Sequence, residues 1–129
     1  MTPRDGGGRF TDVRACAVGV SDTDAAIAWF TGRLGFEVRM DVPMGGASRW
    51  VEVAPPGAST SVALMAGGGP PVGVDTGIRF LVADATGLHA TLTASGVDVD
   101  ALLVTEWAPP MFDFRDPDGN TYYASEGSA

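Results

Sequence analysis

The strongest signal of the fold lies near the C-terminus, in the stretch Phe114-Arg115-Asp116-Pro117-Asp118-Gly119-Asn120-Thr121-Tyr122-Tyr123. Pro117 fixes φ for a turn, and Gly119 and Asn120 tolerate left-handed φ. The carboxylates of the two Asp residues can accept hydrogen bonds from nearby backbone N–H groups. Because apolar residues alternate on both sides of the turn, the stretch predicts a strand, a tight turn and a second strand.

Working outward from this hairpin, the chain shows two copies of one pattern. Each copy has a strand, then an amphipathic helix that is capped by Asp and ends at Gly, and then three strands. The first copy predicts a helix at 23–33 with strands at 13–20, 36–41, 48–53 and 60–65. The second predicts a helix at 85–94 with strands at 77–82, 97–104, 111–115 and 121–125. The repeated order of elements predicts a duplicated βαβββ module.

These patterns divide the chain into one arm and one domain. Residues 1–12 are Gly-rich and polar, which favours a flexible N-terminal arm. The single domain is expected at 13–129, with module one at 13–66, a Gly- and Pro-rich linker at 67–76 and module two at 77–126. A chain of 129 residues is long enough for one domain with a real core.

Composition excludes several classes of function. The net charge is −8 and lysine is absent, so no basic patch is available for nucleic acid or for an anionic membrane surface. No apolar run is long enough to span a bilayer, and no secretory signal peptide is recognisable. The lone Cys16 excludes an intrachain disulfide. We therefore expect a cytoplasmic protein without nucleic-acid or membrane partners.

Three stretches carry a resemblance to a known family: Gly35-Phe36-Glu37-Val38, the segment 49–57 and the segment 111–120. With them the chain, from about residue 10 to residue 126, resembles the vicinal oxygen chelate superfamily. This superfamily includes glyoxalase I, extradiol dioxygenases and bleomycin-resistance proteins. The resemblance implies an α+β fold in which two βαβββ modules form a curved mixed sheet, with helices outside and a central cavity. It also implies a homodimer, in which the cavity is often shared between chains.

The resemblance also locates the positions that bind metal in enzymes of this superfamily. Those enzymes hold one divalent ion through four His, Glu or Gln side chains on the first and last strands of each module. The equivalent positions here are Ala15, Gly77, Tyr123 and the neighbourhood of Ala63. Alanine and glycine have no ligand atoms, and the only histidine, His89, falls on a helix. We therefore expect no metal and no cofactor.

Alternation of side chains along the strands then predicts what lines the cavity instead. Aromatic and apolar walls with a few polar groups suit a small organic ligand. Arg79 could bind a carboxylate or phenolate in a bidentate manner, or it could form a structural ion pair with Asp113 or Glu52. The expected ligand-binding residues are Trp50, Glu52, Arg79, Trp107, Met111, Asp113 and Tyr123.

Two functions remain open at this point. The first is a metal-independent small-molecule-binding protein of the glyoxalase/bleomycin-resistance type, which sequesters an antibiotic-like or aromatic compound. The alternative is a glyoxalase-like lyase, isomerase or dioxygenase. Such an enzyme would use either a non-standard metal site (Glu52, Asp113 and Glu126) or metal-free acid–base chemistry, with Asp113 or Glu52 as base and Tyr123 as acid.

Overall fold

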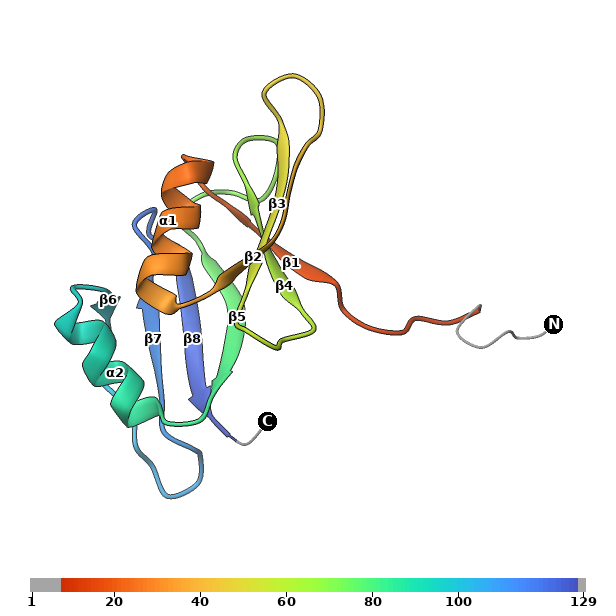
Figure 1. Cartoon of the computed structure of the whole chain (residues 1–129). Coiled ribbons are helices and arrows are strands. Elements are labelled where there is room, and N and C mark those ends of the chain that lie inside the picture. Colours follow the sequence, from red (N-terminus) through yellow and green to blue (C-terminus); the bar gives the residue numbers. More distant parts are fainter. Residues whose placement is uncertain (1–7, 128–129) are drawn as a thin grey trace.

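The computed structural model describes residues 8–127. Residues 1–7 of the predicted arm, and residues 128 and 129, lie outside the described part of the chain. The predicted α+β fold of two βαβββ modules is confirmed (Figure 1). Module one contains β1 (Ala15–Gly19), α1 (Thr23–Leu34), β2 (Glu37–Pro43), β3 (Arg49–Ala54) and β4 (Ser61–Met65). Module two contains β5 (Asp75–Val82), α2 (Ala85–Ala94), β6 (Asp98–Val99), β7 (Met111–Arg115) and β8 (Thr121–Glu126).

The strands form two separate four-stranded sheets within the chain, and not one continuous curved sheet. Sheet one has the order β1-β4-β3-β2 and sheet two the order β5-β8-β7-β6. In each sheet the first and last strands of the module pair in parallel, and the other pairs are antiparallel. In the described chain β1 and β5 are therefore edge strands, and each has one edge without a partner strand.

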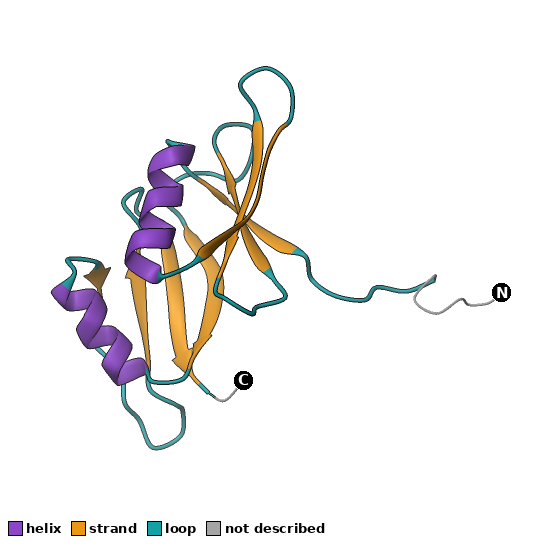
Figure 2. Ribbon diagram, in the orientation of Figure 1, coloured by secondary structure: helices purple, strands orange, loops and turns teal. Residues whose placement is uncertain are grey.

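One shared core explains why the two sheets stay apart. The ring of Phe30, on α1, meets Tyr122 of sheet two edge-on at 5.8 Å between centroids. On the same helix Trp29 stacks on Phe114 of β7 at 6.5 Å, so the tryptophan belongs to the core of its own chain. The core-facing sides of both sheets thus pack around α1, and their other faces point outward. Figure 2 shows the two sheets turned at an angle to each other beside the helices.

Both helices begin and end where local chemistry requires it. The Asp22 carboxylate accepts a hydrogen bond from the Ala25 N–H at the start of α1, and Asp84 does the same for Gly87 at the start of α2. After α1, Gly35 adopts a left-handed φ of 73°, and its N–H donates to a carbonyl of the last turn.

The turn at residues 116–120 does more than close a hairpin. The Asn120 side chain is fully buried, donates from Nδ2 to the Gly19 carbonyl at 2.8 Å, and accepts from the Gly73 and Val74 N–H groups. The Asp116 carboxylate in turn accepts from the Asn120 side chain and from the Tyr122 hydroxyl. The turn therefore links module two to the end of β1 and to the linker.

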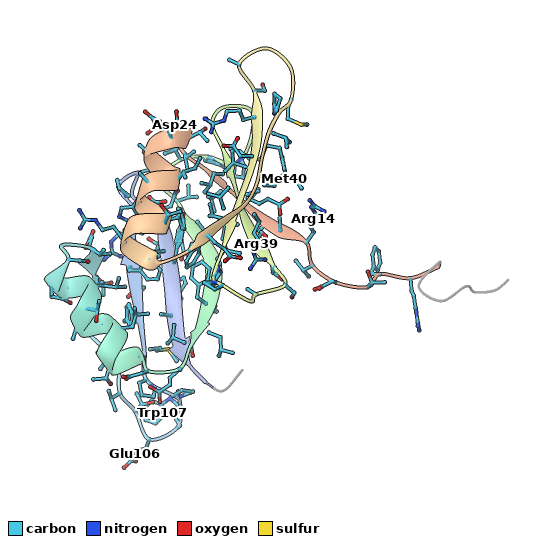
Figure 3. All side chains as sticks on the ribbon, viewed as in Figure 1. Arg14, Asp24, Arg39, Met40, Glu106 and Trp107 are labelled. Carbon is cyan, nitrogen blue, oxygen red and sulfur yellow. The ribbon has the colours of Figure 1, made fainter. Side chains whose placement is uncertain are left out.

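One predicted strand is much shorter than expected. The sequence predicts a strand at 97–104, but β6 covers only two residues. The Asp100 N–H donates to the backbone carbonyl of Asp113, and after this bond the chain leaves the sheet. It returns only for an isolated bridge between Leu103 and Met111. The loop that follows carries Glu106 and Trp107 away from the body of the molecule (Figure 3).

Candidate ligand-binding site

A groove of about 910 Å³ lies between the edge strands of the two modules. Its walls come from the start of module one, the 55–58 turn with the beginning of β4, and most of β5. They are mainly apolar, with side chains such as Val62 and Phe80, and Cys16 lines the groove without being fully buried. Arg79 is the only charged residue of the lining. The volume lies in the range of pockets that bind small organic ligands.

Arg79 is held in place without a carboxylate. Its guanidinium carbon lies 4.4 Å from the centroid of the Tyr123 ring, a cation–π contact. Nη1 donates to the Gly77 carbonyl at 2.9 Å. No ion pair found among residues 8–127 includes Arg79, so within one chain it does not pair with Asp113 or Glu52. Those two carboxylates are bound by other arginines.

Tyr123 is held in place by the carboxylate of Asp75, a residue that is not among the predicted site residues. The Tyr123 hydroxyl donates to Asp75 at 2.6 Å. This hydrogen bond, together with burial, raises the pKa of Tyr123, and the same bond lowers the pKa of Asp75. At neutral pH the pair is therefore a neutral phenol and a carboxylate. The signal for Asp75 was weak because it precedes the predicted start of its strand.

Trp50 and Glu52 lie together on the outer face of sheet one. The Trp50 indole donates to Glu52 Oε2 at 2.6 Å, and Arg14 Nε donates to the same oxygen at 3.1 Å. Burial alone would raise the pKa of Glu52, but these donors hold it below the usual value. Arg14 Nη2 also lies 3.7 Å from the sulfur of Met40, which is the partner of Glu52 on β2; Arg14 and Met40 are labelled in Figure 3.

The remaining predicted residues lie on sheet two or beyond it. Met111 and Asp113 are half-buried on β7, and Asp113 pairs with Arg115 at 3.7 Å. Burial and the neighbouring Asp100 carboxyl raise the pKa of Asp113. Trp107 is 84% exposed on the loop before β7 and does not line the groove.

Strand register places these side chains in two equivalent rows. On sheet two Arg79, Tyr123 and Asp113 are direct partners across β5, β8 and β7. On sheet one the corresponding strands β1, β4 and β3 bring three residues into register: Ala17, Ala63 and Glu52. Each module thus offers one outward row that ends in a carboxylate. Within one chain the two rows lie on different sheets, so the seven predicted residues form no single site.

Within residues 8–127, the side chains at the family's metal positions do not fit a divalent ion. Ala15 and Gly77 offer no ligand atom, and the Tyr123 phenol is already a donor to Asp75. In the non-standard set each carboxylate already has partners. Glu52 accepts from Arg14 and Trp50, Asp113 pairs with Arg115, and Glu126 accepts from the Ala85 N–H at the start of α2. Between residues 8 and 127 no three His, Cys, Asp or Glu side chains are grouped so that they could hold an ion.

Comparison with known proteins agrees with this architecture. The family model described as "Glyoxalase/Bleomycin resistance protein/Dioxygenase superfamily" matches residues 13–122. The chain belongs to this superfamily. Within residues 8–127, no helix has the length and apolar character needed to cross a membrane.

Three relatives illustrate the range of the family. The uncharacterized protein YetH of Bacillus subtilis (strain 168) is 32% identical over 116 residues, which are 85% of this chain and 93% of YetH. A superfamily member from Sphaerobacter thermophilus DSM 20745 shares 33% identity at a TM-score of 0.84, over 92% of this chain and 98% of its own. TnmS3, an antibiotic binding protein from Streptomyces sp. CB03234, shares 33% identity at a TM-score of 0.80 with the same coverage.

Proposed function

We propose that this protein binds a small organic molecule without the help of a metal, and that it sequesters an antibiotic-like or aromatic compound. The observation that carries the proposal is the groove of about 910 Å³, with apolar walls and one charged side chain, Arg79. Such a lining provides contact area for a flat apolar ligand and one polar group that can orient it. The similarity to TnmS3, an antibiotic binding protein, supports the same class of function.

Metal independence is part of the proposal. Its support is the chemistry of the side chains at the family's ligand positions, where alanine and glycine stand in place of His or Glu. Among the metal-free alternatives, Glu52 is a poor candidate for a general base. It is only 3% exposed, its lowered pKa leaves it a weak proton acceptor, and both Arg14 and Trp50 already bind its Oε2.

A homodimer is the second part of the proposal. The unpaired edges of β1 and β5 favour strand pairing with another chain. If β1 of one copy lies beside β5 of a second copy, sheet one is continued by sheet two of its partner, and the groove that β1 and β5 line is bounded by both copies. The outward rows of the two modules then share one concave face: Ala17, Ala63 and Glu52 from one copy, and Arg79, Tyr123 and Asp113 from the other. This arrangement would unite predicted ligand-binding residues that a single chain keeps apart.

The binding proposal is tested by filling the groove. Ala17 is exposed and lines it, so Ala17→Phe should reduce the space available to a ligand. The probe is phenylnaphthylamine, an uncharged dye that fluoresces in apolar surroundings, titrated into protein dialysed against EDTA. We expect the wild-type protein to bind the dye and Ala17→Phe to weaken binding. The matched control is Ala28→Phe on the exposed face of α1. Absence of dye binding, or equal effects of both variants, would contradict the proposal.

A further inference from the structure

We infer that the ligand carries an anionic oxygen group on an aromatic ring, and that Arg79 recognises this group. The inference rests on the proposed function and narrows the chemical class of the ligand. Carboxylates, sulfonates and phenolates all carry such an anionic oxygen.

The charge of the groove contrasts with the charge of the whole chain. The protein has a net charge of −8, yet the only charged side chain that lines the groove is a cation. Around it the walls are largely apolar. An ion pair formed against such walls is weakened less by water than one on an open surface. The groove therefore favours an anion although the chain as a whole repels one.

The other arginines on strands are bound by carboxylates, and Arg79 is not. Arg39 pairs with Glu37, and Arg49 pairs with Asp24 and Asp41. Arg115 pairs with Asp98, Asp100 and Asp113. Arg14, just before β1, pairs with Glu52. In a chain with 16 acidic residues, an arginine on a strand without an ion pair is the exception within residues 8–127.

Most N–H donors of Arg79 make no hydrogen bond within the described chain. A guanidinium has five N–H groups in one plane. In the described chain the only hydrogen bond from Arg79 is the one from Nη1 to Gly77, and the Tyr123 ring covers one face of the plane. The other donors and the opposite face are available. A ring that bears an anionic oxygen can stack on that face or accept bonds at the edge.

Neighbouring carboxylates do not take the place of such a ligand. Asp75 is the acidic group nearest in sequence, and it is engaged by the Tyr123 hydroxyl and the Gly77 N–H. Asp113, across β8 from Arg79, pairs with Arg115. Arg79 lowers the pKa of Asp75 through space, so the two charges interact, but they form no direct ion pair. A ligand anion would therefore meet donors that are preorganised and not already bound.

The test compares two dyes that differ by a single charged group. Anilinonaphthalene sulfonate (ANS) is phenylnaphthylamine with one added sulfonate. Fluorescence titrations give Kd for both dyes on the wild-type protein, on Arg79→Gln, on Arg79→Lys and on Arg9→Gln. Arg9 is exposed outside the groove, so its variant removes the same charge from the chain without changing the site. Circular dichroism and thermal melting show whether each variant folds.

The expected pattern is specific to the anion. Arg79→Gln should weaken ANS binding by about tenfold or more, the effect of losing a charged hydrogen-bond donor, and should weaken phenylnaphthylamine binding much less. Arg79→Lys should retain part of the ANS affinity, and Arg9→Gln all of it.

Other outcomes separate the two proposals. If wild-type protein binds both dyes equally, or if Arg79→Gln weakens both to the same extent, the groove exists but the anion inference is wrong. If neither dye binds the wild-type protein, the proposed function itself fails. If Arg79→Gln does not fold, the wild-type comparison and Arg79→Lys still decide, because the lysine variant keeps the charge and loses only the planar fork.

Discussion

At the scale of single residues, Asn120 is the side chain on which the contact between the modules most depends. Its amide makes four hydrogen bonds, to Gly19, Gly73, Val74 and Asp116, and the Asn120 side chain itself is fully buried. Both ends of the amide are used, one as acceptor and one as donor. A residue that has the same shape but lacks the donor would leave the Gly19 carbonyl unsatisfied and place a second carboxylate beside Asp116.

We therefore expect Asn120→Asp to lower the free energy of unfolding by about 3 kcal/mol or more at neutral pH, the typical cost of an uncompensated buried charge. Urea denaturation followed by tryptophan fluorescence measures the change. Equal stability of wild type and variant at neutral pH would show that the buried amide network does not link the modules.

The lowered pKa of Glu52 gives a second prediction at this scale. A carboxyl with a lowered pKa in the folded state stabilises the fold above its unfolded pKa, and this contribution disappears as the pH falls through the folded value. Glu52→Gln should therefore cost about 1–2 kcal/mol at neutral pH, since it removes a charged acceptor of two hydrogen bonds. The difference from wild type should begin to shrink as the pH falls below the ordinary glutamate range, and it should vanish only on the acid side of the lowered folded pKa.

The control for this experiment is Glu37→Gln. Glu37 forms an ion pair with Arg39 on an exposed surface, where such pairs contribute little. Unfolding curves measured across the acid range should therefore separate Glu52→Gln from wild type and leave Glu37→Gln close to it. A cost of Glu52→Gln that does not depend on pH would mean that shape, and not charge, matters at this position.

At the scale of elements, α1 offers a matched pair of glycines. Gly32 lies inside the helix and Gly35 follows its end with φ of 73°; a Cβ on either would have no heavy atom within 4 Å. Any difference between them must therefore come from backbone conformation. Gly32→Ala should stabilise the protein by about 0.5–1 kcal/mol, and Gly35→Ala should destabilise it by about 1 kcal/mol. Thermal melting of both variants checks the signs, and two shifts in the same direction would contradict this account of the helix end.

The elements also show what the sequence could and could not predict. Helices and hairpins follow from local signals such as Asp22, Gly35 and the turn at 116–120, and these predictions agree with the structure. The strand at 97–104 was predicted from its apolar residues alone, and the chain leaves the sheet there after Asp100. The outward face of each strand was predictable from alternation. The packing of the two sheets against each other was not predictable, because the position of α1 between the modules depends on contacts between residues far apart in the sequence.

The same limit applies to the candidate site. Arg79 stood out because it is a charged residue in an apolar strand, and the structure places it in the groove. Its lack of an ion pair could not be predicted, since it depends on which carboxylate each other arginine reaches. Asp75 carries only a weak local signal and Arg14 carries none. Their roles appear only when strand register brings Tyr123 and Glu52 beside them.

At the scale of the whole molecule, the open edges of β1 and β5 make the oligomeric state a direct prediction. We expect light scattering to give about twice the chain mass of 13.3 kDa. Leu81 is 59% exposed on β5, and Leu81→Glu should weaken the dimer by placing charge at the joined edge. Val72, 47% exposed in the linker, provides the control Val72→Glu. A wild-type monomer, or dissociation of both variants alike, would contradict a dimer formed through these edges.

Metal-free binding of a small organic molecule can be measured directly on the purified protein. Native mass spectrometry of the purified protein, with elemental analysis of the same sample, is carried out with added ANS before and after dialysis against EDTA. We predict a dye-bound protein without stoichiometric divalent metal and the same dye occupancy after EDTA. A stoichiometric metal ion whose removal abolishes dye binding would contradict metal-free binding.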